Sequence, residues 1–559
     1  MYCNKENVNI LTALLVKHGI KHAVVCPGSR NAPIINNLNE CHDIACYPVT
    51  DERSAGFMAL GLAQATGRAV AVCVTSGTAL LNVAPAAAEA TYQHNGIVVI
   101  SADRPEAWID QLDGQTMRQP QALHNCVAKS VTLPQPGNEE ERWHCNRLVN
   151  EALIECNKRN RASVHINVPI GEPLFDFTTA QLPDERKIDF AEAEIGNMTS
   201  LQADFTQAQR PMIVLGQSAP SKTIDNAIAL LQKRAVIVGE PIAAVNTTAH
   251  AEEILYACKN HDDLMPDFVL YVGDAIVSKR LKQFLRKSQA LVWKVGLDSM
   301  VHDTFMHLRG IVEGEPSHIL HNMALHTQNS PLPPSSTAYI ELWQQANRGV
   351  TEHIHAHKPP YSQLMAVREL ELLLQEATQH GTWHVHYANS TSIRLACLYA
   401  QGHHYVWCNR GINGIDGSVS TAAGFSIASE CNTLLVTGDL SFFYDQNALW
   451  NQNLRGNLRI VLLNNGGGGI FRQLKGLENG PLRNNLVAAS HNTHAQGICE
   501  QNHVAYRTAH NEQELRQGVQ WLLTPTSHQP MLLEVLTEAS HDETAYKNFY
   551  YTLYNTINQ

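Results

Sequence analysis

The chain has 559 residues, and at roughly 150 residues per domain this length predicts about three or four domains with large cores. Hydrophobic residues make up 44% and charged residues 17%, which is typical of a globular enzyme and too apolar for a disordered chain. The 41 Lys and Arg against 52 Asp and Glu give a net charge of −11, which argues against a broad surface for nucleic acid or anionic membrane.

The location of the protein is predicted from what the sequence lacks. No apolar run approaches the roughly 20 residues of a membrane span, and the first residues do not form a secretion signal. The 13 cysteines are scattered without a CxxC pair, which favours reduced thiols. We therefore expect a cytoplasmic protein with no nucleic-acid and no membrane partner.

Three segments of the chain alternate short apolar runs with helical stretches. The expected strands are 22–26, 69–74 and 97–101 in the first segment, 211–216, 235–239, 268–273 and 291–296 in the second, and 383–388, 405–408, 433–438 and 459–464 in the third. The Ala-rich stretch 79–92 predicts a buried helix. Because many of these apolar runs end in Gly and helices lie between them, we expect an α/β fold with three doubly wound parallel sheets.

Two linkers are predicted between these segments. Residues 182–197 are acidic and lack apolar periodicity. Residues 328–336 (QNSPLPPSS) are rich in Pro and Ser, which favours an extended connection. The predicted domains are 1–182, 198–328 and 360–559.

The first candidate motif is CPGSR at 26–30, directly after a predicted strand. Gly28 permits a tight turn there, and the backbone amides together with Arg30 are suited to a carboxylate. The alternative is a plain strand-to-helix turn that carries a surface arginine.

The second motif is TDER at 50–53, which precedes a helical stretch. One interpretation is a helix start with Thr50 as the cap and the acidic residues in the first turn, where the helix dipole favours them. The other is functional: Glu52 at a strand end, facing a dry cleft, is placed to share a proton.

The third motif joins two strand ends. Asp439 follows one apolar strand, and Asn465 with four glycines (466–469) follows the next. In a doubly wound sheet both ends lie at the carboxyl edge, where ligands bind. Carboxylate, amide and carbonyl oxygens suit Mg²⁺, and glycines let the backbone approach phosphates. The alternative is a mobile glycine loop.

The histidine-rich motifs favour structural roles. His353, His355 and His357 in HIHAHKPP alternate like metal ligands, but their position beside the second linker favours solvated residues. His384 and His386 share one face of a strand, which favours core or cleft lining. No HExxH, Walker A or GxGxxG motif is present, and this weakens the zinc-protease, kinase and simple dehydrogenase interpretations.

Taken together, these motifs resemble those of thiamine-diphosphate-dependent enzymes. The pair of Asp439 and Asn465 is similar to the family's diphosphate–magnesium motif, although Leu440 stands where Gly is usual. That departure resembles one branch, the 2-succinyl-5-enolpyruvyl-6-hydroxy-3-cyclohexene-1-carboxylate synthases of menaquinone biosynthesis. The branch also resembles this chain at CPGSRNAPI, TDERSAGFMALGLA, VTSGTALLN, SADRPE, GQTMRQ, NRGINGIDGSVSTAAG, GDLSFFYD and NNGGGGIF.

The resemblance implies a particular architecture. It assigns 1–182 to a pyrimidine-binding domain, 198–328 to a central Rossmann-like domain and 360–559 to a diphosphate-binding domain. In such enzymes the cofactor lies between the first domain of one subunit and the third domain of another. Glu52 and Asp439 would then meet only across a subunit interface. We therefore expect a homodimer or homotetramer and exclude a functional monomer.

The resemblance also implies the cofactor chemistry. Glu52 would hydrogen-bond the pyrimidine of thiamine diphosphate and favour the tautomer that removes the C2 proton. Ile415 would hold the cofactor bent. Asp439, Asn465 and the Gly467 carbonyl would bind Mg²⁺ or Mn²⁺. The cofactor-binding residues implied are Glu52, Ser390, Ile415, Gly438, Asp439, Leu440, Asn465, Ile470 and Phe471.

The reaction implied is the decarboxylation of 2-oxoglutarate, followed by conjugate addition of the remaining carbanion to isochorismate. Both substrates are dianions, so the pocket needs several cations. The residues implied on the isochorismate side are Ser29, Arg30, Arg104, Lys279 and Arg280, and those on the 2-oxoglutarate side are Ser390, Arg394 and Arg410. Gln115 would lie near the acceptor carbon, and with Glu52, Arg394 and Arg410 it completes the implied catalytic set. For Arg104 the alternative is a structural role, as an ion pair with Asp103 in a turn. For Ile470 and Phe471 the alternative is packing in the core.

Two other functions remain open from the sequence. One is a different thiamine-diphosphate carboligase or decarboxylase, such as an acetohydroxyacid synthase, for whose small monoanionic substrates the pair Arg394 and Arg410 would be excessive. The other is a non-catalytic metabolite-binding relative. The joint presence of Glu52, Asp439 and Asn465 argues against it, because a sensor needs no activated cofactor.

Overall fold

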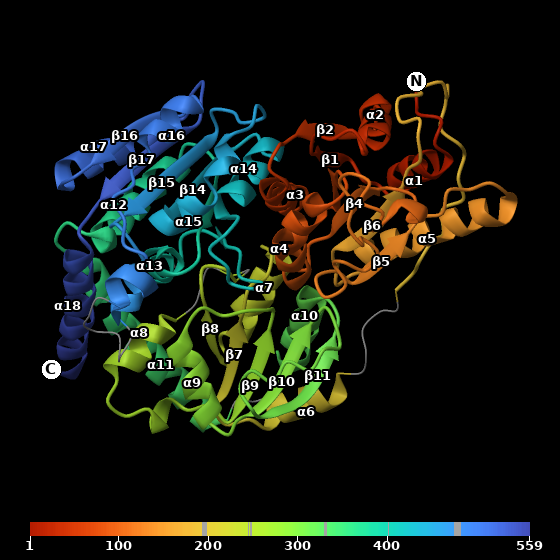
Figure 1. Ribbon diagram of the computed structural model, residues 1–559. Helices are drawn as coiled ribbons and strands as arrows, with labels where there is room; N and C mark the ends of the chain where they lie inside the picture. Colours follow the sequence, from red (N-terminus) through yellow and green to blue (C-terminus); the bar gives the residue numbers. More distant parts are fainter. Residues whose placement is uncertain (193–197, 244, 246–248, 329–332, 401, 474–481) are drawn as a thin grey trace.

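The computed structural model describes residues 1–192, 198–243, 245, 249–328, 333–400, 402–473 and 482–559. Three sheets, all built from parallel strand pairs, form three α/β units, here called the first, central and third units. The first and third units lie side by side, and the central unit packs below both (Figure 1). The expected α/β fold with three doubly wound parallel sheets is confirmed. The domain limits stay predictions.

The first unit has a six-stranded sheet of order β2-β1-β3-β4-β6-β5. Its strands are β1 (His22–Val25), β2 (Ala45–Pro48), β3 (Val70–Val74), β4 (Ile97–Asp103), β5 (Lys129–Thr132) and β6 (Val164–Pro169). Its helices are α1 (Glu6–Lys17), α2 (Ala32–Glu40), α3 (Glu52–Thr66), α4 (Thr78–Tyr92) and α5 (Glu139–Asn157). The expected strands near 22, 69 and 97 and the helix 79–92 are confirmed within a few residues. β2, β5 and β6 were not predicted.

The central unit has a five-stranded sheet of order β11-β10-β9-β7-β8. Its strands are β7 (Pro211–Leu215), β8 (Val236–Gly239), β9 (Phe268–Val272), β10 (Leu291–Gly296) and β11 (Leu308–Glu313). Its helices are α6 (Thr199–Gln207), α7 (Lys222–Leu231), α8 (Ala251–Ala257), α9 (Lys279–Lys287) and α10 (Pro316–Thr327).

The third unit repeats the strand order of the first, as β13-β12-β14-β15-β17-β16. Its strands are β12 (Trp383–Tyr387), β13 (Val406–Trp407), β14 (Asn432–Gly438), β15 (Leu458–Asn464), β16 (Ala505–Ala509) and β17 (Met531–Leu536). Its helices are α12 (Gln363–Thr378), α13 (Thr391–Tyr399), α14 (Ser418–Ala428), α15 (Asp439–Tyr444), α16 (Gln496–Gln501), α17 (Glu512–Leu522) and α18 (Ala539–Asn558).

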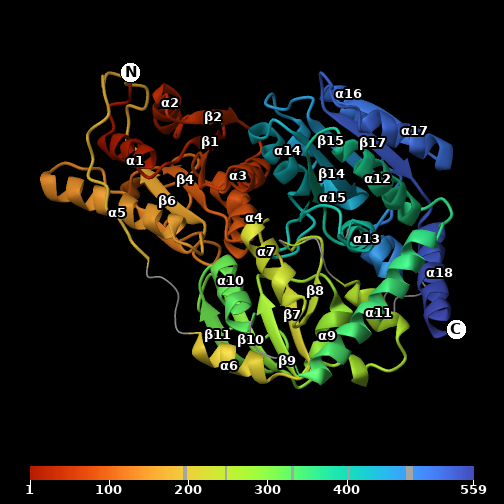
Figure 2. The same cartoon turned by 180° about the vertical axis from the view of Figure 1, so that it is seen from behind.

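The repeated topology brings two equivalent helices together. α3 follows the second strand of the first unit, α14 follows the second strand of the third, and the two helices pack against each other in both views (Figures 1 and 2). Glycines allow this approach, because a methyl group on Gly61 would overlap the backbone of Thr421 and one on Gly424 would overlap that of Met58. The buried residues of α3 and α14 belong to one shared core.

The second predicted linker is partly wrong. Residues 329–332 lie outside the described residues, but Pro334 begins the long helix α11 (Pro334–Ala356) instead of continuing an extended connection. His353 is buried on α11, and its ring packs against His357 and Phe549. The prediction that His353 is solvated is therefore wrong, because α18 covers this face of α11. Of the first linker, residues 193–197 also lie outside the described part.

The HxH pair on β12 lines the core as expected. The rings of His384 and His386 both contact Phe425 of α14. Burial lowers the pKa of His386 to about 3, so this imidazole is neutral. Among the described residues, no helix combines the length and apolar character needed to cross a bilayer.

Candidate active site

Asp439 and Asn465 lie at the ends of neighbouring strands. β14 and β15 pair in parallel, and each residue follows directly on its strand, as predicted. Asp439 is 3% exposed, and its Oδ1 accepts the N–H of Leu440 at 2.6 Å. Its Oδ2 accepts the N–H groups of Gly467 at 2.9 Å and Asn465 at 3.2 Å. The carboxylate thus ties the glycine-rich loop after β15 to the start of α15.

The same edge offers oxygen ligands. Asn465 donates its Nδ2 to Asp542 at 2.8 Å, so its amide oxygen faces away from that carboxylate. Carboxylate, amide and carbonyl oxygens are ligands that Mg²⁺ prefers. Among the described residues, no group of three His, Cys, Asp or Glu side chains is placed to hold a metal. The oxygen donors at this edge therefore suit a hard cation shared with a phosphate.

The backbone around this edge leaves room for a diphosphate. A Cβ atom built on Gly438 would meet no atom within 4 Å, so the end of β14 faces open space. Gly467 has φ 153°, and a Cβ there would lie 2.8 Å from the carbonyl oxygen of Ala488. A glycine is therefore required where the loop turns past Asp439, and the residues present fit thiamine diphosphate with its metal.

Burial also sets the electrostatics of Asp439. Burial raises the pKa of this carboxyl group, and the hydrogen bonds from Gly467 and Leu440 oppose the rise. His491 lies close by, with Nε2 at 3.5 Å from Oδ2 of Asp439. The sequence analysis missed His491, because a single histidine 52 positions downstream carries no spacing signal.

Ser390, Arg394 and Arg410 gather where the strand order of the third sheet reverses, a position that binds ligands in such folds. Ser390 follows β12 with φ 71°, an unusual conformation for a residue other than glycine. Asn389 accepts Nη1 of Arg410 at 3.0 Å and donates to the carbonyls of Asn409 at 2.5 Å and Gly414 at 2.6 Å. Asn389, which the sequence analysis missed, therefore fixes the segment that carries Arg410.

Both arginines keep unused hydrogen-bonding capacity. The Nε atoms of Arg394 and Arg410 are buried and have no hydrogen-bond partner in the described part of the chain. Buried donors without partners are unfavourable, so an anion at this position would be stabilised. Lys282 of α9 lies in the same charged region, and its pKa is lowered first by burial and then by Arg410. The sequence analysis did not single out this third cation.

Ile415 lies in the loop before α14 and is 38% exposed. Ser441 of α15 donates its hydroxyl to the Ile415 carbonyl at 2.5 Å, which fixes the loop beside Leu440. Ile470 and Phe471 lie in the short 3₁₀ helix η4 (Gly469–Gln473), and both are half-buried. The structure thus leaves all three apolar side chains partly open to a ligand.

Glu52 is the first residue of α3, at the end of the connection that follows β2. The cap is Asp51 and not Thr50, since Asp51 Oδ1 accepts the N–H of Arg53 at 2.9 Å. The flanking residues contact the third unit of the same chain: Asp51 accepts from Asn447 at 2.7 Å, and Arg53 donates to the Tyr444 carbonyl at 2.5 Å. The start of α3 therefore lies against α15 and the turn after it within one chain.

Arg30 is not the surface arginine of the plain-turn alternative. It is 6% exposed, donates to the Ile170 carbonyl at 2.9 Å, and pairs with Glu172 at 3.1 Å. Ser29 beside it is exposed. Glu172 is largely exposed, so solvent reaches this ion pair from the Glu172 side.

The ion pair of Arg104 differs from the structural alternative considered above. Arg104 pairs with Asp113 at 2.9 Å, whereas Asp103 accepts only its backbone N–H. Gln115 is exposed and donates its Nε2 to the Ser76 carbonyl at 2.7 Å, beside Gly77 at the end of β3. Both residues therefore lie near the carboxyl edge of the first sheet.

The central unit presents its two candidate cations at the start of α9. Lys279 is exposed, and Arg280 pairs with Glu252 at 3.2 Å and lies over the ring of Tyr256. Ser278 caps the helix through Leu281. α9 also carries Lys282, so one helix links these cations to the region of Arg394 and Arg410.

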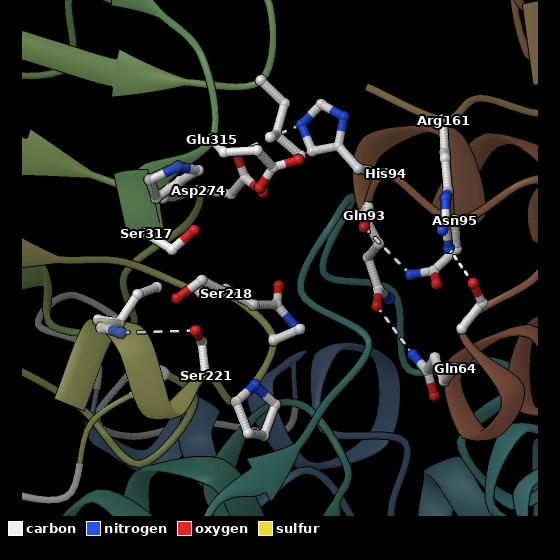
Figure 3. Close-up of a pocket in the computed structure, with 18 of the residues that line it drawn as sticks. Gln64, Gln93, His94, Asn95, Arg161, Ser218, Ser221, Asp274, Glu315 and Ser317 are labelled. Carbon is white, nitrogen blue, oxygen red and sulfur yellow. Dashed lines mark hydrogen bonds and ion pairs between the residues drawn. The ribbon is translucent and has the colours of Figure 1, made fainter. Parts of the chain in front are cut away.

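A separate cavity of about 300 Å³ lies where the three units meet (Figure 3). Gln64, Gln93 and His94 line it from the first unit, and Ser218 and Asp274 line it from the central unit. None of the predicted site residues lines this cavity. Its walls instead contain an inter-unit contact between His94 Nε2 and Asp274, 3.5 Å apart.

Comparison with known proteins identifies the family. Residues 6–125 match the family described as thiamine pyrophosphate enzyme, N-terminal TPP binding domain. The chain is 38% identical to a 2-succinyl-5-enolpyruvyl-6-hydroxy-3-cyclohexene-1-carboxylate synthase of Phocaeicola vulgatus and 40% identical to one of Bacteroides thetaiotaomicron, each over 99% of this chain and 100% of the relative. A synthase of the same name from Flavobacterium johnsoniae is 32% identical over 95% of this chain and 96% of its own. The chain belongs to this synthase family.

Membership of the synthase family confirms the resemblance drawn from CPGSR, NRGINGIDG and the other motifs. The interpretation of Leu440 as a departure typical of this branch stays a prediction. The roles of the individual site residues, the metal and the assembly are not tested by these similarities and stay predictions.

Proposed function

We propose that this chain catalyses the thiamine-diphosphate-dependent decarboxylation of 2-oxoglutarate and the conjugate addition of the resulting four-carbon unit to isochorismate. The products are 2-succinyl-5-enolpyruvyl-6-hydroxy-3-cyclohexene-1-carboxylate and CO₂, in menaquinone biosynthesis, so the enzyme is a transferase. The observation that carries the proposal is the 38–40% identity to synthases of this name over their whole length. The Nε atoms of Arg394 and Arg410, which have no hydrogen-bond partner among the described residues, support it independently, because they suit a dianionic oxo acid.

In this proposal the third unit holds the cofactor. Asp439, Asn465 and the Gly467 carbonyl bind Mg²⁺ or Mn²⁺, and the open edge at Gly438 takes the diphosphate. Thiamine diphosphate, when bound, supplies the nucleophilic carbon and accepts the electron pair that decarboxylation releases. Glu52 holds a proton at the pyrimidine nitrogen, and Ile415 supports the bent shape of the cofactor.

The cations divide between the two substrates. Arg394 and Arg410, with Ser390, bind 2-oxoglutarate, and a planar guanidinium can hold a carboxylate at two points. Ser29, Arg30, Arg104, Lys279 and Arg280 bind isochorismate, with Gln115 near the carbon that is attacked. Arg30, Arg104 and Arg280 each pair with a protein carboxylate, so isochorismate binds by replacing exposed or half-exposed partners.

The assembly proposed is a homodimer or homotetramer in the cytoplasm, with active sites at the subunit interface. Large apolar side chains near the proposed site are exposed in the single chain, and a second copy would cover them: Ile412 at 49%, Tyr444 at 52% and Trp450 at 55%. The 13 free cysteines support a reducing compartment.

One assay tests this function. Purified protein is incubated with 2-oxoglutarate, isochorismate, thiamine diphosphate and Mg²⁺, and the product is identified by mass. We expect the succinylated cyclohexene product, with pyruvate a poor replacement for 2-oxoglutarate. Formation of acetolactate from pyruvate at a comparable rate would instead assign the chain to an acetohydroxyacid synthase activity.

A further inference from the structure

A buried glutamate of the first unit contacts the proposed 2-oxoglutarate site of the third unit. Glu89 lies on α4 and is 3% exposed. Its Oε1 accepts the backbone N–H of Gly411 and its Oε2 that of Ile412, both at 2.7 Å. A third donor, Nε2 of Gln93, lies 2.5 Å from Oε1. Three N–H groups thus converge on one carboxylate.

The segment held in this way is pressed against α4. A Cβ atom on Gly411 would lie 2.8 Å from the Glu89 carbonyl oxygen and 2.9 Å from the Cβ of Tyr92. A glycine is therefore needed for the backbone to come close enough to donate to the carboxylate. The contact is built from both sides, by a glutamate on the helix and a glycine on the loop.

The held segment carries two of the proposed site residues. Arg410 directly precedes Gly411, and Ile415 follows three residues after Ile412. Within the third unit Asn389 fixes the segment through Asn409 and Gly414. Glu89 provides the second anchor, between those two points. The segment is thus held from the sheet on one side and from the first unit on the other.

A short polar chain extends the anchor into the first unit. Gln93 accepts from Gln64 of α3 at 2.9 Å, a contact drawn in Figure 3, and its Nε2 also lies 3.4 Å from Oδ1 of Asn409. Burial raises the pKa of Glu89, and the hydrogen bonds from Ile412, Gln93 and Gly411 oppose that rise. Amide donors on both oxygens favour the ionised carboxylate over any neutral replacement.

We infer that Glu89 is a positioning residue for the 2-oxoglutarate half of the reaction. By fixing the backbone at Gly411 and Ile412, it sets the direction of the Arg410 guanidinium and the place of Ile415, without touching substrate or cofactor. The inference deepens the proposed function, since it rests on the roles given there to Arg410 and Ile415. It gives the first unit a role in the 2-oxoglutarate site of its own chain.

The test uses Glu89→Gln in the full-length, cofactor-loaded protein. The amide keeps one acceptor but turns an NH₂ group toward the other backbone N–H, leaving that donor unpaired. We expect the KM for 2-oxoglutarate to rise about tenfold or more, while the KM for isochorismate changes less than about twofold. Glu89→Asp keeps the charge on a shorter side chain and should recover part of the loss. If the Gln variant does not fold, the same measurements are made on Glu89→Asp.

Hydrogen exchange measures the anchor without any activity. Backbone amides of residues 408–415 should exchange faster in Glu89→Gln than in the unmodified protein, also without cofactor. Asp267→Asn is the matched control, because Asp267 accepts two consecutive backbone N–H groups, of Gln209 and Arg210, at 2.8 Å each in the central unit. This control should leave both KM values unchanged.

Four results would overturn the inference. Unchanged exchange at 408–415 would show that Glu89 does not hold the segment. The contact would be merely structural if exchange is faster while the KM for 2-oxoglutarate is unchanged. It would also be merely structural if the KM values for both substrates rise equally and thermal stability falls. If Arg410→Ala itself leaves 2-oxoglutarate binding intact, the proposed function of Arg410 fails, and the inference with it, whereas the exchange result still reports the anchor.

Discussion

Gly61 of α3 lies directly against the backbone carbonyl of Thr421 in α14, with no space between them for a side chain. The two helices hold equivalent positions in sheets of the same strand order. Their close packing fixes the start of α3, where Glu52 lies, against the unit that carries Asp439. The contact therefore holds the unit that carries Glu52 against the unit that carries Asp439 within one chain.

We expect Gly61→Ala to destabilise the protein. The added methyl group must push α3 away from α14, and such overpacking typically lowers the free energy of unfolding by about 1–3 kcal/mol. Thermal and urea unfolding measure the change. Gly497→Ala is the control, because a Cβ at Gly497 in α16 meets nothing within 4 Å. Equal stability of the two variants would contradict the close packing described here.

Removal of the metal should abolish activity reversibly. Chelation takes away the cation that Asp439 and Asn465 are proposed to share with the diphosphate, and Mg²⁺ or Mn²⁺ with thiamine diphosphate should restore the rate. Ligand at about 100 times its Kd stabilises a protein by about 2.7 kcal/mol, so the unmodified protein should melt at a higher temperature with both added. Asp439→Ala should show no such shift. Full activity in stripped protein would exclude the site.

Glu52→Gln should slow deuterium exchange at C2 of bound thiamine diphosphate. The amide keeps the shape of the side chain but cannot serve as the acid that stabilises the active tautomer. General acid–base contributions of about 10²–10⁴-fold set the expected loss. Isotope exchange followed by NMR measures it, with Glu40→Gln on the exposed surface as the control. If exchange proceeds at the rate of the unmodified protein, Glu52 has no role beyond the start of the helix.

The arginines should separate the two halves of the reaction. Arg394→Ala and Arg410→Ala each remove a cation from the proposed 2-oxoglutarate pocket, and loss of a desolvated charge contact costs roughly 2–5 kcal/mol. We expect both variants to impair CO₂ release from 2-oxoglutarate, and the accompanying change in circular dichroism, even without isochorismate.

Arg30→Ala should behave in the opposite way. CO₂ release from 2-oxoglutarate stays nearly normal, because Arg30 lies on the first unit, and only the addition to isochorismate fails. If Arg30→Ala blocks CO₂ release while Arg394→Ala spares it, the two pockets are assigned the wrong way round.

Stability should depend on pH through Asp445. Burial raises the pKa of Asp445 from 3.8 to about 7, against the hydrogen bonds from Ser420. Since the folded protein then binds this proton more tightly than the unfolded chain, the free energy of unfolding falls as pH rises from about 4 to about 7. Urea unfolding across this range should show a flatter slope for Asp445→Asn. If the free energy of unfolding falls equally with pH in both proteins, a group other than Asp445 is titrating.

The sequence allowed the cofactor edge to be predicted because its signals are local. An apolar strand followed at once by Asp439 or Asn465 puts a polar side chain at the end of that strand. The parallel pairing of the two strands then places both side chains at the same edge of the sheet. The exposed edge strands β2 and β16 were missed, because alternating or weakly apolar runs of four or five residues resemble turns. The burial of His353 was not predicted, because the adjacent prolines indicated a linker. The structure instead has a helix there, which α18 covers.

The contacts that hold the segment carrying Arg410 could not be predicted from the sequence. Asn389 contacts residues 20 and 25 positions away, and Glu89 contacts residues 322 and 323 positions away. No periodicity or spacing relates such partners, and Glu89 lies in an Ala-rich helix whose pattern indicates only burial. The contacts of Asn389 become visible only in the folded third unit, and those of Glu89 only once the first and third units are placed against each other.

The most direct test of the proposed activity uses uniformly ¹³C-labelled 2-oxoglutarate with unlabelled isochorismate, thiamine diphosphate and Mg²⁺. Mass spectrometry should find one labelled carbon in CO₂ and the other four in the cyclohexene product, and Arg394→Ala should lower both yields together. Labelled CO₂ without a labelled product, or a product that keeps all five labelled carbons, would contradict coupled decarboxylation and addition by this protein.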